Sequence, residues 1–182
     1  MLYNPDNKTI TTERLILRLF SIDDAETVTS LCNNINIYRG TLGLPYPYNI
    51  ENALSWIPTH MENFDNNRSY EFAVTDQITG ELYGCMGLQN NQSHRNGEAG
   101  YWVGEPYWGM GIATEALRAI IDFAFTHKEY HKVYASHYAS NPASGRVMQK
   151  AGMHCEGTQT DQVLKDGRYE TLILYGIINP SA

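Results

Sequence analysis

Tyr107-Trp108-Gly109-Met110-Gly111-Ile112-Ala113-Thr114-Glu115-Ala116 is the most telling stretch of the sequence, because two glycines directly precede a long amphipathic helical pattern. Glycine lets the backbone turn without a Cβ atom and approach a ligand closely. The first turn of the helix that follows offers N–H groups without partners inside the helix, and the helix dipole adds to their attraction for an anion such as a pyrophosphate. A Gly-x-Gly before a helix is more often an ordinary strand-to-helix turn, so the pattern alone leaves both interpretations open.

The chain around this loop alternates between strand-like and helical patterns. Before the loop, three strand-like runs predict an antiparallel meander over residues 70–75, 82–88 and 98–104. After it, the patterns predict a helix over 112–128, a strand over 133–137, a helix over 141–151 that begins at Asn141 and Pro142, and a hairpin of 156–164 and 169–177.

The N-terminal part predicts a strand over 14–19, a helix from Ser21 to about Asn33-Asn34, a loop over 37–49 and a second helix over 50–64. The resulting order is β-α-α-β-β-β-α-β-α-β-β, an α/β arrangement around a mixed sheet. No repeat or linker divides the 182 residues, so we expect one domain over 1–182 with its core at about 11–177.

Bulk properties exclude several classes of protein. Hydrophobic residues make up 42% and charged residues 18%, and no apolar run reaches the roughly 20 residues of a membrane helix. The N-terminus lacks a secretory pattern, so we expect a cytoplasmic protein without a membrane partner. A net charge of -7 argues against nucleic-acid binding. Three separated cysteines and six scattered histidines predict neither disulfides nor a metal site.

Three further motifs accompany the glycine loop, namely 12–18 (TERLILR), 97–103 (GEAGYWV) and 141–153 (NPASGRVMQKAGM). In this order the four motifs resemble the GNAT superfamily of N-acetyltransferases, and within it the branch that acetylates ribosomal-protein N-termini. The resemblance spans about Thr11 to Tyr175. It implies a single-domain, mixed and mostly antiparallel twisted sheet flanked by helices, with acetyl-CoA as cosubstrate and no metal.

The resemblance also implies where acetyl-CoA binds. The loop before the third helix would hold the pyrophosphate through backbone amides, and the preceding strand would pair with the pantetheine arm. No Lys or Arg lies between Glu105 and Thr114, and Trp108 stands where the family has a basic or amide residue, so we expect amides and the helix dipole to bind the phosphates. The cofactor-binding residues expected are Trp102, Val103, Trp108, Gly109, Met110, Gly111, Ile112, Ala113, Thr114, Asn141 and Ser144.

Two residues are candidates for catalysis. Glu98 opens the strand expected to carry the thioester and could act as the general base, although a solvent-facing strand carboxylate is the alternative. Many GNAT enzymes have a tyrosine at the position of Met148, which cannot donate a proton. In the ribosomal branch a serine is the proposed donor, and Ser144 matches it; a serine that only bonds the helix backbone is the alternative. Tyr138 is a reserve donor.

The predicted reaction is direct transfer of acetyl to a primary amine. At pH 7, deprotonating an α-amine costs about 1.4 kcal/mol and a lysine about 4.6 kcal/mol, so an α-amine needs only a modest base. A protein N-terminus is favoured; a small-molecule amine (polyamine, amino acid or antibiotic) and a non-catalytic acyl-CoA-binding module remain alternatives. Segments 38–48 and 164–169 would select the acceptor. Both a monomer and a homodimer fit the sequence.

Overall fold

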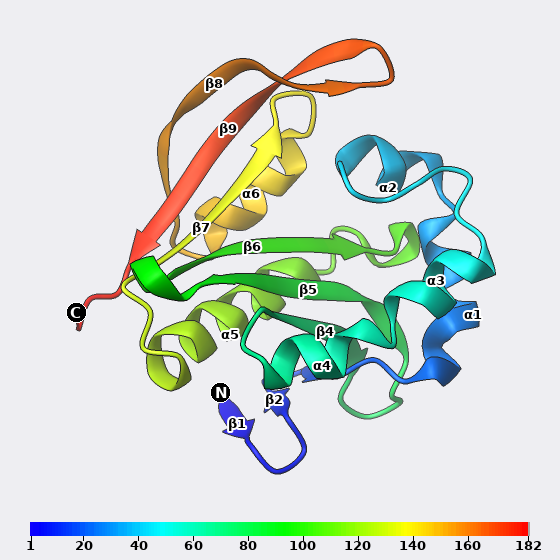
Figure 1. Ribbon diagram of the computed structural model, residues 1–182, viewed down its shortest axis with the longest axis vertical. Coiled ribbons are helices and arrows are strands. Elements are labelled where there is room, and N and C mark those ends of the chain that lie inside the picture. Colours follow the sequence, from blue (N-terminus) through cyan, green and yellow to red (C-terminus); the bar gives the residue numbers. More distant parts are fainter. Residues whose placement is uncertain (182) are drawn as a thin grey trace.

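The computed structural model describes residues 1–181 as one twisted sheet with helices on both faces (Figure 1). Within these residues nine strands run in the order β1-β2-β3-β4-β5-β6-β7-β9-β8, and β6–β7 is the one parallel pair. The strands are β1 (Leu2–Asn4), β2 (Thr9–Thr11), β3 (Leu15–Arg18), β4 (Ser69–Asp76), β5 (Leu82–Asn91), β6 (Asn96–Val103), β7 (Lys132–Tyr138), β8 (His154–Lys165) and β9 (Arg168–Ile178). The expected fold class, a mixed and mostly antiparallel sheet, is confirmed.

The helices are α1 (Ala25–Cys32), α2 (Ile35–Gly40), α3 (Ile50–Trp56), α4 (Thr59–Asp65), α5 (Ile112–His127) and α6 (Pro142–Lys150). Short 3-10 turns cover Ile22–Asp24, Gln92–His94 and Glu105–Tyr107. No described helix is long and apolar enough to cross a membrane.

Two apolar clusters fix the two layers of helices. On one face of the sheet, Phe72 of β4 packs with Ile120 and Phe123 of α5, and all three are fully buried. On the other face, Val28 of α1 and Ala53 of α3 pack in a second cluster with Trp102 of β6. Because side chains alternate along a strand, β6 contributes Ala99, Tyr101 and Val103 to the first face and Trp102 to the second.

Strands β6 and β7 part after a short pairing. Their register covers three pairs, Asn96 with Lys132, Gly97 with Val133 and Glu98 with Tyr134, although β6 continues to Val103 and β7 to Tyr138. Beyond these pairs β7 stays with β9, while β6 stays with β5 (Figure 1). The sheet is therefore open between the C-terminal halves of β6 and β7, and the backbone of β6 is unpaired on that side.

The N-terminal part differs from the sequence-based expectation in three places. The hairpin β1–β2 precedes the expected first strand, and its two strands of three residues are too short to show a periodicity. Residues 37–40, expected at the start of a loop, belong to α2, because the Asn34 side chain accepts hydrogen bonds from the N–H groups of Asn36 and Ile37.

The helix expected over 50–64 is two helices, α3 and α4. Pro58 separates them, because proline has no N–H to donate and its ring clashes with the preceding helical turn.

Candidate functional site

A cavity of about 1040 Å³ lies beside the C-terminal end of β6, where β6 is no longer paired with β7. Its walls come from the end of β6, the loop before α5, the first turn of α5, one side of α6, α2 and the β8–β9 hairpin. Its volume lies at the upper end of the range for ligand pockets, which suits a long ligand.

The glycine loop forms one end of this cavity. Gly109 and Gly111 have φ angles of +79° and +81°, a left-handed conformation that side chains with a Cβ atom rarely adopt. The first bond of α5 runs from the Glu115 N–H to the Gly111 carbonyl at 3.0 Å. The N–H groups of residues 112–114 precede this bond and have no carbonyl partner inside the helix. The loop thus has the geometry of an anion-binding helix N-terminus.

The Trp108 side chain connects the loop to the preceding strand. Its indole Nε1 donates to the Val103 carbonyl at 2.6 Å, which ties the loop to the end of β6. Its side chain therefore has no free donor for a phosphate.

Arg14 fixes the loop from outside. Its Nη1 donates to the Met110 carbonyl at 3.0 Å, and its Nε donates to Glu115 Oε2 at 2.7 Å. The Arg14 N–H and the Thr12 hydroxyl donate to Glu115 Oε1 at 2.9 and 2.6 Å. Burial opposes the ionised form of Glu115, but these hydrogen bonds outweigh it and lower its pKa. The first motif of the sequence is thereby joined to the glycine loop.

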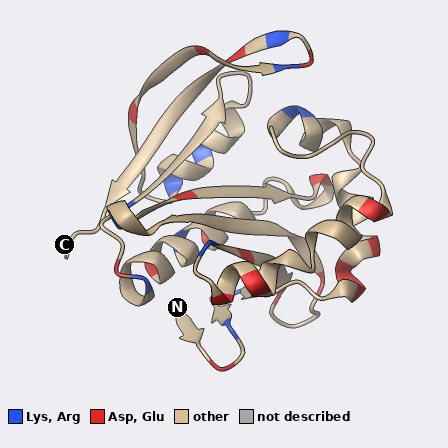
Figure 2. Ribbon diagram, in the orientation of Figure 1, with Lys and Arg blue, Asp and Glu red and all other residues tan. Residues whose placement is uncertain are grey.

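Basic side chains reach the cavity from other elements. Arg146 and Lys150 of α6 line it, and Arg14, Arg118 and Lys150 line a second, adjoining cavity that shares Gly111 and Thr114. Figure 2 marks the Lys and Arg positions of α6 in blue. The loop itself carries no basic side chain, as the sequence shows, and the fold places basic side chains of other elements beside it.

All but one of the residues expected to bind the cofactor line the main cavity. They are Trp102, Val103, Trp108, Gly109, Gly111, Ile112, Ala113, Thr114, Asn141 and Ser144. Met110 is the exception: it lies outside the lining, with its side chain about half exposed and its carbonyl bonded to Arg14.

Ser144 lies in the first turn of α6, where Asn141 caps the helix by accepting from the Ser144 N–H at 3.4 Å. The Ser144 hydroxyl is 2.8 Å from the hydroxyl of Tyr101 on β6. Met148 is 1% exposed and packs in the core, and the Tyr138 hydroxyl is buried without a partner. Of the two candidate donors, Ser144 lines the cavity and Tyr138 does not.

Glu98 lies in the last residue pair before β6 and β7 part. It shares its face of the sheet with Trp102, opposite the face that packs on α5. Burial raises the pKa of the half-buried Glu98, and a hydrogen bond with Ser136 of β7 acts in the opposite sense. Glu98 does not line the cavity, so the structure does not bring it together with Ser144.

A second carboxylate on this face, Glu71 of β4, was missed from the sequence. Its row across the sheet continues with Gly87 and Gly100, which leave no side chain between Glu71 and the opening beside β6. Glu71 Oε2 is buried without a hydrogen-bond partner, and burial raises the pKa of the carboxyl group. A carboxylate inside the apolar run Tyr70-Glu71-Phe72-Ala73-Val74 was the signal that could have revealed it.

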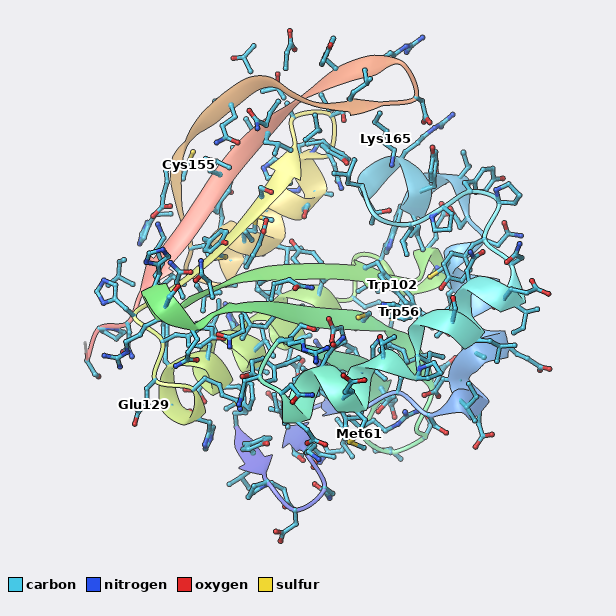
Figure 3. All side chains as sticks on the ribbon, viewed as in Figure 1. Trp56, Met61, Trp102, Glu129, Cys155 and Lys165 are labelled. Carbon is cyan, nitrogen blue, oxygen red and sulfur yellow. The ribbon has the colours of Figure 1, made fainter. Side chains whose placement is uncertain are left out.

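The β8–β9 hairpin and α2 meet over the mouth of the cavity. Lys165 Nζ donates to the carbonyls of Tyr38, at 2.6 Å, and of Thr41, and Tyr38 donates from its hydroxyl to Asp166 Oδ1 at 2.5 Å. Figure 3 labels Lys165 where the hairpin approaches α2. The two segments expected to select the acceptor thus form one rim.

Comparison with known proteins identifies the family. The family model described as an acetyltransferase (GNAT) domain matches residues 14–154. The chain belongs to the GNAT acetyltransferases. It is an acetyl-CoA-dependent N-acetyltransferase, as the resemblance implied. Among residues 1–181 no group of three or more His, Cys, Asp or Glu side chains could hold a metal ion.

Three similar proteins illustrate the range of the family. The chain is 29% identical to the uncharacterized N-acetyltransferase YoaA of Bacillus subtilis, over 93% of this chain and 96% of that relative. It resembles the structure of RimL, a ribosomal L7/L12 α-N-protein acetyltransferase in complex with CoA, with a TM-score of 0.87 and 17% identity over 96% and 99% of the two chains. It also resembles spermidine N-acetyltransferase from Vibrio cholerae in complex with CoA and spermine, with a TM-score of 0.78 and 24% identity over 92% and 97%.

Proposed function

We propose that this acetyltransferase modifies the α-amine of a protein N-terminus, as the ribosomal-protein acetyltransferases it resembles do. The observation that carries the proposal is the position of Glu98, a half-buried carboxylate of raised pKa where β6 and β7 part. An α-amine with a pKa near 8 is partly neutral at physiological pH, so this single modest base suffices.

The two substrates enter from opposite faces of the sheet in this proposal. Acetyl-CoA lies in the cavity on the α5–α6 side, with its pyrophosphate at the amides of residues 112–114 and near Arg146 and Lys150. The unpaired backbone of β6 holds the pantetheine arm, and its N–H groups stabilise charge on the thioester oxygen. The amine approaches over Gly100 from the side of Glu98 and Glu71.

Glu98 accepts a proton from the amine, directly or through one water molecule. Glu71 attracts the amine while the amine is still a charged ammonium group. The buried Oε2 of Glu71 has no hydrogen-bond partner, and an ammonium N–H can donate to it. Asn141 and Ser144 contact the pantetheine end of the cosubstrate. We also propose that the protein is located in the cytoplasm as a monomer or a homodimer.

A polyamine is the second candidate acceptor. The two carboxylates, Glu71 and Glu98, on the acceptor face and the net charge of -7 also suit a small polycation. The similarity to the spermidine enzyme agrees with this alternative.

A panel of acceptors separates the two candidates. Purified protein with acetyl-CoA is given unblocked peptides, the same peptides with acetylated N-termini, spermidine and spermine, and release of free thiol is followed. We expect release only with the unblocked peptides. Preferred turnover of spermidine or spermine would assign the polyamine function instead.

A further inference from the structure

Two hydroxyl groups meet where the cavity enters the opening of the sheet. Tyr101 lies on β6 three residues beyond Glu98, the last paired residue, and its hydroxyl is 2.8 Å from Ser144 Oγ and 3.1 Å from the Ser144 carbonyl. Both residues line the cavity. Among residues 1–181, Tyr101 is the side chain that hydrogen-bonds the Ser144 hydroxyl.

The surroundings of this pair allow Tyr101 to act as the donor. Burial raises the pKa of Tyr101 to about 12, so its phenol stays protonated at neutral pH and can donate. Asn141 holds the Ser144 backbone through the helix cap. When Tyr101 donates to Ser144 Oγ, the serine keeps its own proton free for a ligand in the cavity. A serine in the first turn of a helix commonly hydrogen-bonds the backbone of its own helix, whereas the Ser144 hydroxyl bonds that of Tyr101.

We propose that Tyr101 is a positioning residue, whose hydroxyl turns that of Ser144 toward the CoA sulfur so that Ser144 can donate a hydrogen bond to the departing thiolate. The inference rests on the proposed function, in which Ser144 contacts the pantetheine end. Met148 cannot donate a hydrogen bond to the thiolate, because its thioether has no proton to donate and is buried in the core.

The reaction balances without proton transfer from the serine. The amine nitrogen bonds to the acetyl carbon, the carbon–sulfur bond breaks, and its electron pair stays on sulfur. The surplus proton of the amine passes to Glu98 and from there to solvent. A thiol has a pKa near 8.5, so the thiolate is a stable leaving group that needs a hydrogen bond rather than a full proton.

The pKa of the thiol of bound CoA tests this pair without any acceptor. It is measured by ultraviolet titration of the complex with CoA, using the complex with desulfo-CoA as the blank. We expect Tyr101→Phe and Ser144→Ala each to raise this pKa by about one unit, the effect of losing one charge-assisted hydrogen bond, and the double variant to match Ser144→Ala. A thiol pKa unchanged by Tyr101→Phe would overturn the proposal, as would additive shifts.

Turnover supplies the second test. We expect Tyr101→Phe to lower kcat about tenfold with little change in the KM for acetyl-CoA, and to have no further effect in the Ser144→Ala background. Tyr83→Phe is the matched control, because it removes a hydroxyl bonded to Asp76 at 2.9 Å in the same sheet, at a residue that does not line the cavity. An equal loss in both backgrounds would contradict the proposal.

The two proposals fail differently. If the wild type releases no thiol with any amine, the proposed function fails, and the thiol titration still tests the hydroxyl pair. If release is normal and Tyr101→Phe behaves as wild type, the pair fails and the function stands.

Discussion

Glu98 combines a cost to stability with a use in catalysis. Burial raises its pKa, so folding favours the protonated form of this carboxyl group. The stability that protonated Glu98 contributes is complete at pH values below the pKa of Glu98 in the unfolded chain. It is lost as the pH rises through the pKa of Glu98 in the folded protein. Above its folded pKa, Glu98 is an ionised carboxylate that destabilises the fold, and this is the form that can accept a proton.

Glu98→Gln is expected to separate these effects. The variant should have a kcat lower by about a hundredfold, because it lacks the base, and an unchanged affinity for CoA. The decline of wild-type kcat as the pH falls through the raised pKa of Glu98 should disappear. At pH 7 the variant should unfold at a higher temperature than the wild type, by calorimetry.

The control is Glu62→Gln, which removes an exposed carboxylate on α4 paired with Arg68. It should leave kcat and its pH profile unchanged. Wild-type turnover by Glu98→Gln would remove Glu98 from the mechanism.

The loop before α5 depends on a strand far away in sequence. Arg14 and Thr12 hold Glu115 in the first turn of α5, and Arg14 also holds the Met110 carbonyl. The amides of residues 112–114 are thereby kept aimed into the cavity before any ligand binds, which lowers the entropy cost of binding. Because the pKa of Glu115 is lowered, this anchor stabilises the fold above the ordinary value of 4.5 and is lost as the pH falls through the folded pKa.

Arg14→Gln should weaken this anchor. We expect the KM for acetyl-CoA to rise about tenfold and the KM for the amine to stay the same, since the acceptor side is untouched. Initial-rate kinetics with each substrate varied in turn measure both constants. Arg68→Gln breaks an ion pair whose side chains are 60% and 68% exposed, and should change neither. Equal changes in both variants would show that the effect of Arg14→Gln is one of overall charge.

Across the whole molecule, the elements with strong local sequence patterns were predicted most accurately. The helix of α5, the meander β4–β6 and the β8–β9 hairpin were predicted to within a few residues, because each carries a strong local pattern. The motifs also predicted ten residues of the cavity lining. Short elements such as β1, β2 and α2 were not predicted, since their structure depends on caps and on neighbouring strands.

Contacts between residues far apart in the sequence were not predicted either. Arg14 at the glycine loop and Tyr101 at Ser144 join residues separated by 96 and 43 positions, and no local pattern links them. The position of Glu98 outside the cavity could not be predicted either, because it follows from where β6 and β7 part.

One peptide that carries both a free α-amine and a lysine side chain tests the proposed acceptor most directly. The wild type and Glu98→Gln are incubated with this peptide and acetyl-CoA at pH 7, and fragmentation mass spectrometry locates the acetyl group. Since deprotonating lysine costs about 3 kcal/mol more than deprotonating an α-amine, we expect the wild type to acetylate only the N-terminus, and much faster than Glu98→Gln. Acetyl on the lysine, or a peptide left unmodified while spermidine is consumed, would contradict a protein N-terminus as the acceptor.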